Sequence, residues 1–351
     1  MSVWDSYPDD YRSREVQAIL SAVQAGECFS IVGLSGAGKS NLIGFLANRS
    51  PLAAPRSALV DCNRLPDPSP EALYALARRT LGDTQPADDE FQALESVVDR
   101  RLSSLPDGLC LLFDRFDTLS LANSTLFGNL RALRDAFKYK LTYVTSTRRP
   151  LDQHTELAEL FFANTLWLGP LSESDARWNV ARYAQRKGMT WDETTVGGIL
   201  RFSGGYPSLL RAVCEACSDG TPLEARSLIE HPAIKVRVVE FWADQPGEDD
   251  LRRSRLIGQP LLCSGRFPPT DQQLTAKEHL LLKYLRQHPN QVCDKDDLIR
   301  AVWPEDRIFE RGVRDDSLAQ LIRRLREKIE PDPSSPSHIF TVPGRGYRYV
   351  P

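Results

Sequence analysis

The sequence predicts an α/β domain with a doubly wound parallel sheet, followed by a small helical domain and a third domain of three helices and a β-hairpin. Short apolar runs of strand type alternate with helical patterns up to about residue 170. The strand-like runs then stop, and helical patterns continue to residue 243. Three more helical patterns and two β-type runs fill the C-terminal part. We therefore expect domains at 1–170, 171–243 and 271–351, with a linker at 244–270.

The composition is that of a soluble globular protein with more than one domain. The chain has 351 residues, of which 41% are hydrophobic and 26% charged. Its 44 basic and 47 acidic residues give a net charge of −3, so any surface that binds nucleic acid must be local. No apolar run approaches the roughly 18 residues of a membrane span, the N-terminus lacks the features of a signal peptide, and the seven cysteines are scattered. We expect a cytoplasmic protein with reduced thiols and no membrane partner.

A glycine-rich loop at residues 33–40 fits the pattern G-x-x-x-x-G-K-[ST], with a strand-like run before it (29–32) and a helical run after it. The glycines let successive backbone N–H groups turn inward around a di- or triphosphate, and the helix adds its positive N-terminal end. Lys39 would reach the β and γ phosphates, and Ser40 would hold Mg²⁺. The alternative is a glycine-rich turn without nucleotide. The residues expected here to bind ATP or ADP are Gly33, Ser35, Gly36, Ala37, Gly38, Lys39, Ser40 and Asn41.

The other elements of the first domain follow in order around this loop. A helical pattern over 11–27 leads into the first strand. After the loop we expect strands at 57–62, 109–114, 141–150 and 164–168, and helices at 68–81, 88–102, 121–137 and 151–162. Five strands that alternate with helices make a doubly wound α/β domain.

Two of these strands end in residues suited to phosphate chemistry. The run 109–114 is continuously apolar and ends in Asp114, as a central strand does at the ligand edge of a parallel sheet. Asp114 can therefore hold magnesium, through water or Ser40. The strand 141–150 ends beside it in hydroxyls and arginines, so a Thr or Ser can hydrogen-bond the attacking water and Arg148 can sense the γ-phosphate. The alternative is that these arginines only solvate a strand end.

The second domain is entirely helical in pattern. The sequence 172–175, Ser-Glu-Ser-Asp, caps a helix that continues to Lys187, and further helices are expected at 191–202 and 207–218. A small helical domain after a nucleotide-binding fold usually acts as a lid. The turn that ends at Pro207 can present backbone and a proline ring to an adenine.

In order along the chain, these motifs resemble those of STAND ATPases, the signal-transduction relatives of AAA+ proteins. The resemblance covers roughly residues 10–240 and rests on Arg14-Glu15, Gly33 to Ser40, Asp114 with Asp117, Thr145-Ser146 with the following arginines, Leu168 to Ser172, and Gly205-Tyr206-Pro207. It implies an ADP-bound closed state and an ATP-bound open state, with Pro207 near the base.

One residue departs from the pattern of such ATPases. Many P-loop ATPases of the additional-strand class carry a glutamate directly after the magnesium aspartate, where it polarises the attacking water; here that residue is Arg115. An arginine cannot act as a base. Asp117 must therefore take this role or hydrolysis is slow, which favours a switch over a motor.

The C-terminal domain reads as a winged helix-turn-helix. Residues 244–270 carry the breakers of connecting sequence, with an apolar stretch that could form a short strand pair. Helices are then expected at 277–287, 294–302 and 315–329, followed by β-type runs at 339–342 and 347–350 that the turn Pro-Gly-Arg-Gly joins. The sequence of 271–351 resembles the C-terminal DNA-binding domain of OmpR/PhoB-type regulators. Its wing and the start of its third helix are most similar to the CadC/ToxR branch.

The third of these helices can present a DNA-reading face. If Leu318, Ile322, Leu325 and Ile329 point inward, a 100° step places polar residues on the opposite side and its flank. Gln320, Arg323 and Arg324 suit adenine and guanine edges, while Ser317 suits phosphate. On the wing, Arg345 would enter the minor groove or touch phosphate. The alternative is that the arginines only solvate the helix.

Together these features predict an ATP-responsive transcription regulator that binds double-stranded DNA and uses ATP/ADP and Mg²⁺. ATP-driven homo-oligomerisation would raise the affinity for repeated half-sites. No sensor repeat is visible in the sequence, so a sensor protein or RNA polymerase is a further partner to expect. Two rivals remain open. One is a DNA-remodelling AAA+ ATPase such as a replication initiator or transposition helper, and the other is a defence or stress ATPase whose winged helix contacts proteins.

Overall fold

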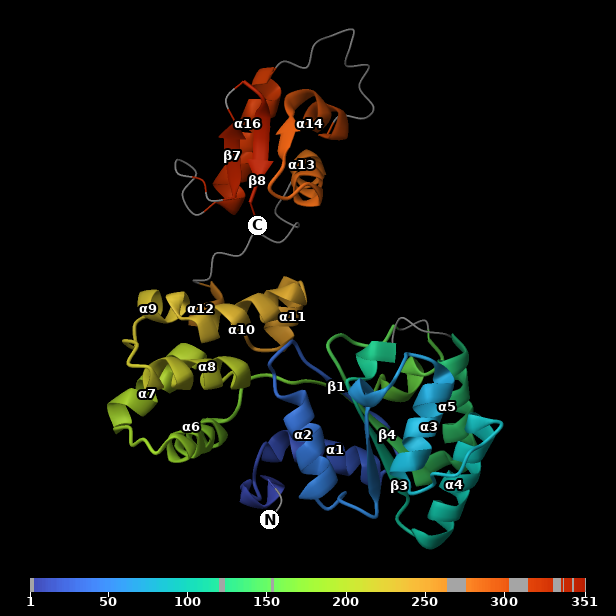
Figure 1. Ribbon diagram of the computed structural model, residues 1–351. Helices are drawn as coiled ribbons and strands as arrows, with labels where there is room; N and C mark the ends of the chain where they lie inside the picture. Colours follow the sequence, from blue (N-terminus) through green and yellow to red (C-terminus); the bar gives the residue numbers. More distant parts are fainter. Residues whose placement is uncertain are drawn as a thin grey trace. The chain divides into compact units, whose positions relative to one another are not determined.

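The computed structural model describes residues 3–119, 124–152, 155–263, 276–302, 315–330, 336, 338–342 and 344–350. The chain divides into two compact units, Met1–Leu262 and Cys263–Pro351, and each is described by itself (Figure 1).

The first unit is built on a five-stranded parallel sheet of order β2-β3-β4-β1-β5. The strands are β1 (Phe29–Val32), β2 (Ser57–Asp61), β3 (Leu109–Asp114), β4 (Leu141–Thr147) and β5 (Thr165–Trp167). Every residue of β1, β3 and β4 is buried, which explains why these strands read as apolar runs without alternation. The predicted doubly wound α/β domain with five strands is confirmed.

Helices cover both faces of this sheet. They are α1 (Ser13–Gln24), α2 (Lys39–Asn48), α3 (Pro70–Thr80), α4 (Glu90–Ser104) and α5 (Ser124–Phe137), with short 3₁₀ turns at Val3–Ser6, Cys62–Arg64, Phe116–Leu119 and Lys138–Lys140. Helix α2 lies on one face, and α3, α4 and α5 lie on the other (Figure 1). The first residues of the helix expected from 121 lie outside the described residues.

The helix expected over 151–162 is wrong for the described part of that segment. Only a 3₁₀ helix, η5 (Ala158–Phe161), forms there, and residues 153–154 lie outside the described residues. The segment begins directly after Pro150, and the carbonyl of Asp152 accepts both the N–H and the hydroxyl of Thr155. Thr155 thus bonds the residue three positions before it, whereas an α-helix would bond its N–H to the fourth.

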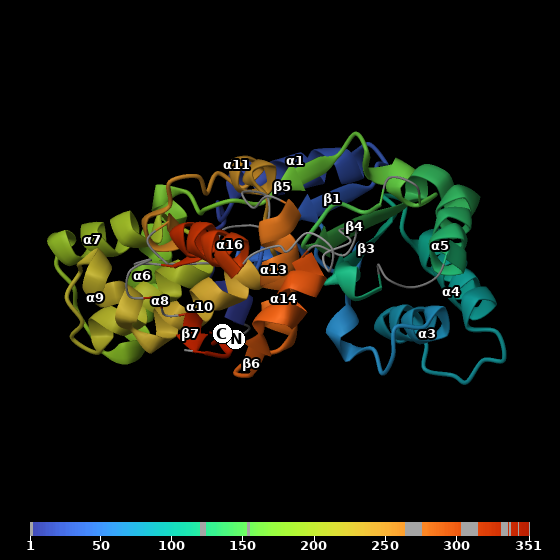
Figure 2. The same cartoon turned by 90° about the horizontal axis from the view of Figure 1, so that it is seen from above.

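The rest of the first unit is helical. It contains α6 (Glu173–Lys187), α7 (Glu193–Ser203), α8 (Pro207–Ser218), α9 (Ala225–Glu230), α10 (Pro232–Ala243), α11 (Glu248–Arg253) and α12 (Pro260–Cys263). Ser172 caps α6 as predicted, because its hydroxyl accepts the N–H of Asp175 at 3.1 Å. Figure 2 shows α6 to α10 gathered on one side of this unit, with α3, α4 and α5 on the other.

Much of the expected linker belongs to the first unit. Residues 248–253 and 260–263 are helical, so no strand pair occurs in the described residues 244–263. Leu256, Leu261 and Leu262 are buried, and the Gln259 side chain donates to the carbonyl of Phe202 at 2.8 Å. The breakers in this segment therefore separate two short packed helices. Residues 264–270 lie outside the described residues.

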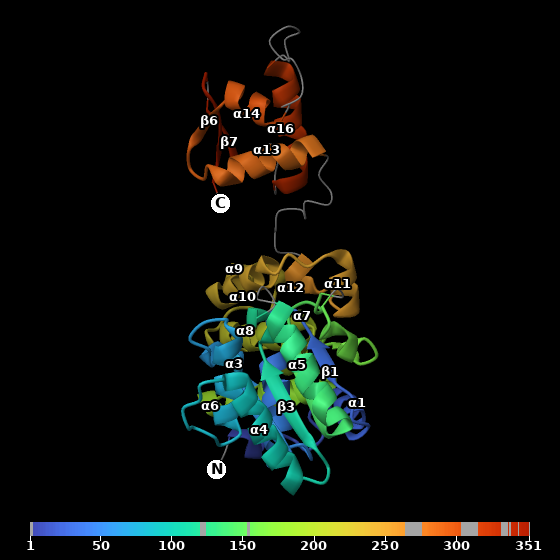
Figure 3. The same ribbon diagram turned by 90° about the vertical axis from the view of Figure 1, so that its right-hand side faces the viewer.

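The second unit has the expected helices and hairpin. It contains α13 (Ala276–Gln287), β6 (Val292–Asp294), α14 (Lys295–Val302), α16 (Asp315–Ile329), β7 (Ile339–Val342) and β8 (Gly346–Tyr349). The strands pair antiparallel in the order β6-β8-β7, and Figure 3 shows α13, α14 and α16 beside this short sheet. Strand β6 was not predicted. The unit is a winged helix-turn-helix, as the sequence predicts.

Candidate functional site

The glycine-rich loop runs from the end of β1 to the start of α2, as its pattern predicts. Gly36 and Gly38 have φ of +85° and +88°, a region that favours glycine. A Cβ on Gly36 would also overlap the hydroxyl of Ser208, which lies on α8. The loop therefore needs glycine both for its own backbone and for the approach of the helical domain.

Lys39 lies at the start of α2 with its ammonium close to the loop. Its Nζ donates to the carbonyl of Gly33 at 2.5 Å and to that of Leu34 at 3.4 Å. Burial lowers its pKa to about 8, and the nearby Asp117 and Asp244 carboxylates oppose that shift. A buried ammonium that bonds carbonyl oxygens in the described part of the chain is suited to an anionic ligand.

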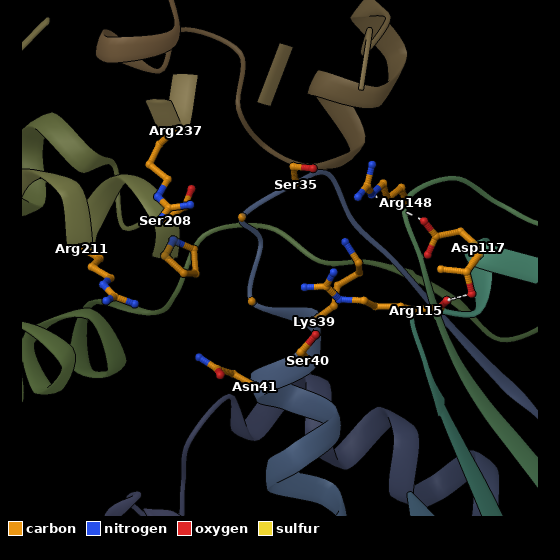
Figure 4. Close-up of a pocket in the computed structure, with 14 residues that line it drawn as sticks. Ser35, Lys39, Ser40, Asn41, Arg115, Asp117, Arg148, Ser208, Arg211 and Arg237 are labelled. Carbon is orange, nitrogen blue, oxygen red and sulfur yellow. Dashed lines mark hydrogen bonds and ion pairs between the residues drawn. The ribbon is translucent and has the colours of Figure 1, made fainter. Parts of the chain in front are cut away.

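A cavity of about 440 Å³ opens beside this lysine, between three parts of the first unit (Figure 4). The loop and α2 contribute Ser35, Gly36, Gly38, Lys39, Ser40 and Asn41; the strand ends contribute Arg115, Asp117, Thr118 and Arg148; the helical part contributes Pro207, Ser208, Arg211 and Arg237. Five of these side chains are cationic and one is acidic, so the cavity favours an anion such as a polyphosphate. Gly33 and Ala37, also expected to bind nucleotide, do not line the cavity.

Asp114 lies at the end of β3, buried and outside the cavity lining. The hydroxyl of Ser146 donates to its Oδ1 at 2.6 Å and accepts the N–H of Arg115 at 2.9 Å. The only proton of that hydroxyl therefore points at Asp114. Thr145 and Thr147 have buried hydroxyls without a partner in the described residues. The Ser146 hydroxyl, one of those expected to hydrogen-bond the attacking water, is therefore used to position the Asp114 carboxylate.

The arginines after β4 contact carboxylates and carbonyls. Arg148 lies 3.5 Å from Asp117 and donates to Asp244 at 3.2 Å. Arg149 donates to the backbone carbonyls of Asp244 at 2.7 Å and Gln245 at 3.2 Å. Both arginines therefore have specific partners, which argues against the alternative that they only solvate the strand end.

The helical part closes onto the loop at the predicted turn. The hydroxyl of Tyr206 donates to the carbonyl of Ser35 at 2.7 Å, and the N–H of Ser208 donates to that of Gly36 at 3.2 Å. Burial raises the pKa of Tyr206 well above its ordinary value, so this hydroxyl stays a donor. Pro207 packs near Gly38. The turn thus touches the phosphate loop through three consecutive residues.

Sequence reasoning missed several residues of this site. Arg211 lies one helical turn after Pro207 on α8, so helical spacing could have suggested it. Arg237 and Asp244 carry no such signal, because they come to the site through the packing of α10 against α8. Buried Arg12 was also missed; its guanidinium donates to the carbonyls of Ala37 and Gly169, each at 3.1 Å.

In the second unit, α16 turns the predicted face outward. Leu318, Ile322, Leu325 and Ile329 are buried, whereas Gln320, Arg323, Arg324 and Arg345 are exposed. The Arg323 side chain is 80% exposed and its guanidinium donates to Glu327 at 3.1 Å, so a ligand could draw it away at little cost. Arg326 instead bonds the carbonyl of Ile339, as expected of a structural residue. The side chain of Ser317 lies outside the part of the chain that the structure describes.

The described residues contain no group of three or more His, Cys, Asp or Glu side chains suited to a metal ion. They also contain no helix long and apolar enough to cross a membrane.

A phosphate loop on a parallel sheet, joined to helices that close over it, defines a P-loop NTPase. The family model described as Novel STAND NTPase 1 matches residues 11–212 of the 351, and the chain belongs to this family. A second model, Transcriptional regulatory protein, C terminal, matches residues 270–349. The second unit is thus an OmpR/PhoB-type domain. The chain thus joins an NTPase domain to an OmpR-type DNA-binding domain.

The chain spans less than half the length of the two transcriptional regulatory proteins that it matches by sequence. The transcriptional regulatory protein YvrH of Bacillus subtilis is 44% identical over 71 residues, which are 20% of this chain and 28% of YvrH. A probable transcriptional regulatory protein of Picosynechococcus is 32% identical over 129 residues, which are 36% of this chain and 49% of that protein. Among solved structures, a Walker-type ATPase of Pyrococcus abyssi is 13% identical with a TM-score of 0.47, over 99% of this chain and 97% of that one.

Proposed function

We propose that this chain is a transcriptional regulator that works as a nucleotide switch, in which ATP or ADP in the cavity of the first unit controls DNA binding by the winged helix. The observation that carries the proposal is the cation-rich cavity, because phosphate loop, strand ends and helical part all line it. A ligand there contacts the part of the unit that continues along the chain into the DNA-binding domain.

The residues present fit a magnesium-bound nucleotide. The left-handed φ values of Gly36 and Gly38 let the loop turn, and both residues line the cavity, where Lys39 would supply the charge for the β and γ phosphates. Ser40 lines the cavity and would hold Mg²⁺ together with Asp114, through water, since this ion needs few protein ligands beside phosphate oxygens. When bound, Mg²⁺ would neutralise phosphate charge. Pro207 would lie near the base.

Hydrolysis is expected to be slow. Arg115 lines the cavity where a catalytic carboxylate would stand, and it cannot accept a proton. Asp117 also lines the cavity, and Arg148 lies 3.5 Å from it, so the Asp117 carboxylate is partly committed to an ion pair. Such a site suits a nucleotide state that persists long enough to act as a signal.

The DNA contacts proposed are those of α16 and the wing. Gln320, Arg323 and Arg324 would read base edges, with Ser317 on phosphate and Arg345 on phosphate or in the minor groove. Several copies of the chain, assembled in the ATP state, would bind repeated half-sites with a raised effective concentration. A sensor protein or RNA polymerase remains a proposed further partner.

Removal of the lysine charge tests the proposal. Lys39→Ala should lose ATP and ADP in titration calorimetry while its circular dichroism and thermal unfolding stay those of a folded protein. Lys187→Ala, at the end of α6 and away from the cavity lining, is the matched control and should bind as the wild type does. Unchanged nucleotide affinity in a folded Lys39→Ala protein would show that the phosphate loop is not the site.

Selection of bound sequences from random DNA, with ATP and with ADP, tests the DNA half of the proposal. A defined sequence enriched only with ATP is the expected result. If no sequence is enriched, even at low salt, the proposed DNA binding is contradicted. If DNA strongly stimulates ATP turnover, a remodelling ATPase is favoured instead.

A further inference from the structure

The carboxylate of Asp244 lies against the phosphate loop. Its Oδ2 accepts the backbone N–H of Ser35 at 2.6 Å, and its Oδ1 accepts Nη1 of Arg148 at 3.2 Å. The Asp244 side chain is only 5% exposed, although the residue follows the end of α10. A backbone amide and a guanidinium that converge on the two oxygens of one buried carboxylate form a complete anion site, and the chain itself supplies the anion.

The two donors stand where the outer end of a polyphosphate would be. Ser40 and Lys39 lie at the start of α2 and would hold the phosphates nearest that helix. Ser35 belongs to the first half of the loop, and Arg148 follows β4 beside Asp117. Figure 4 shows Ser35 and Arg148 on the far side of Lys39 from Asn41. A diphosphate held by the helix end need not reach them, whereas a third phosphate would extend toward them.

We infer that Asp244 fills the subsite of the terminal phosphate, so that the closed site accepts a nucleoside diphosphate and resists a triphosphate. This inference rests on the proposed nucleotide function and names the residue that distinguishes its two states. A terminal phosphate and the Asp244 carboxylate need the same N–H and guanidinium, and as like charges they repel when close. A triphosphate therefore binds fully only after Asp244 has left.

Displacement of Asp244 would change the contacts of the residues that follow it in the chain. Arg149 donates to the backbone carbonyls of Asp244 and Gln245. If the Asp244 side chain leaves the loop, we expect these main-chain hydrogen bonds to break as well. Residue 245 also has φ of +48°, an uncommon value outside glycine, and helix α11 begins three residues later. The segment that a triphosphate would release is thus the one that leads through α11 and α12 to the second unit.

Replacement of the internal anion tests the inference in the full chain. Titration calorimetry with ADP and with a non-hydrolysable ATP analogue is done on wild type, Asp244→Asn and Asp244→Ala. Asn is isosteric and removes the charge, and Ala removes both acceptors. Because hydrogen bonds to charged groups are among the stronger ones, the affinity for the ATP analogue should rise about tenfold or more, with the ADP affinity within about twofold of wild type. Asp249→Asn, the same charge change on the exposed side of α11, should leave the ratio unchanged.

The outcomes separate this inference from the proposed function. An equal gain for both nucleotides, or no gain, overturns the role of Asp244 and leaves the nucleotide site intact. Absence of any binding to the wild type overturns the proposed function itself. Hydrogen exchange on the wild type needs no variant: the peptide spanning 240–253 should exchange faster with the ATP analogue than with ADP, and equal protection by both contradicts the inference.

Discussion

At the scale of single residues, Lys39 is the group whose charge responds most directly to a ligand. Its pKa of about 8 lies below the ordinary 10.5 because of burial, so at pH 8 the ammonium is about half deprotonated. Between those two pH values the unfolded chain binds more protons than the folded one, so this residue's contribution to stability rises with pH there. A polyphosphate anion beside Nζ favours the charged form and raises the pKa.

Nucleotide binding at pH 8 should therefore take up roughly half a proton, and binding at pH 6 should take up almost none. Calorimetry in buffers of different ionisation enthalpy measures this uptake, and the pH 6 titration is the internal control. Proton release at pH 8, or equal uptake at both pH values, would contradict the assignment of Lys39 to the phosphates.

The second prediction for single residues concerns Arg115 and Asp117, which follow β3. Asp117→Ala should lower the slow ATP hydrolysis, because Asp117 carries the one carboxylate among the described residues that line the cavity. Arg115→Glu should raise the rate, because it places a base next to Asp114, the aspartate proposed to hold Mg²⁺. Phosphate release under single-turnover conditions measures both rates. A fast wild-type rate, or an Arg115→Glu protein no faster than wild type, would speak against a switch with a missing base.

The sequence predicts some of these site residues and not others for a physical reason. Gly36, Gly38 and Lys39 belong to one contiguous loop whose backbone must turn around phosphate, so their spacing is visible in the chain. Asp244 and Arg237 come to the site because α10 packs against α8, and no local pattern records that contact.

At the scale of elements, α16 and the wing make separable contributions to DNA binding. Arg323→Ala or Arg324→Ala should cost about 1–3 kcal/mol on the specific site and relax specificity at one base pair, since both side chains are exposed on the face away from the core. Arg345→Ala should weaken all sequences alike. Binding to specific and random DNA at one salt concentration distinguishes the two patterns, and equal losses on both DNAs for all three variants would mean that α16 does not read bases.

Element prediction succeeded where a buried face repeats and failed where the elements are short. The helical spacing of Leu318, Ile322, Leu325 and Ile329 correctly predicted which face of α16 is buried. The apolar run of β3 correctly predicted a strand that is buried on both faces. Strand β6 has only three residues, and α11 and α12 are bounded by the same breakers that linkers contain. Such elements depend on their packing partners.

At the scale of the whole molecule, the turn at Pro207 is the place where the helical part meets the phosphate loop. Pro207 is the first residue of α8 and packs near Gly38, with Tyr206 and Ser208 bonded to the loop on either side of it. Alanine is well tolerated at the start of a helix, so Pro207→Ala should keep α8 and lose the ring that touches the loop. Pro232→Ala, at the start of α10 and outside the cavity lining, is the matched control.

Pro207→Ala should therefore bind ATP through Lys39 and Ser40, but ATP should no longer change its assembly or its affinity for DNA. Linkage demands the converse in the wild type: operator DNA must tighten ATP binding by the factor by which ATP tightens DNA. The affinity for ATP is measured with and without DNA, and the affinity for DNA with and without ATP, so the factor is obtained twice. The Pro232→Ala protein should show the same factor. If the two ligands bind independently to the wild type, the two units are merely tethered, because a switch that acts through binding cannot have a coupling factor of one.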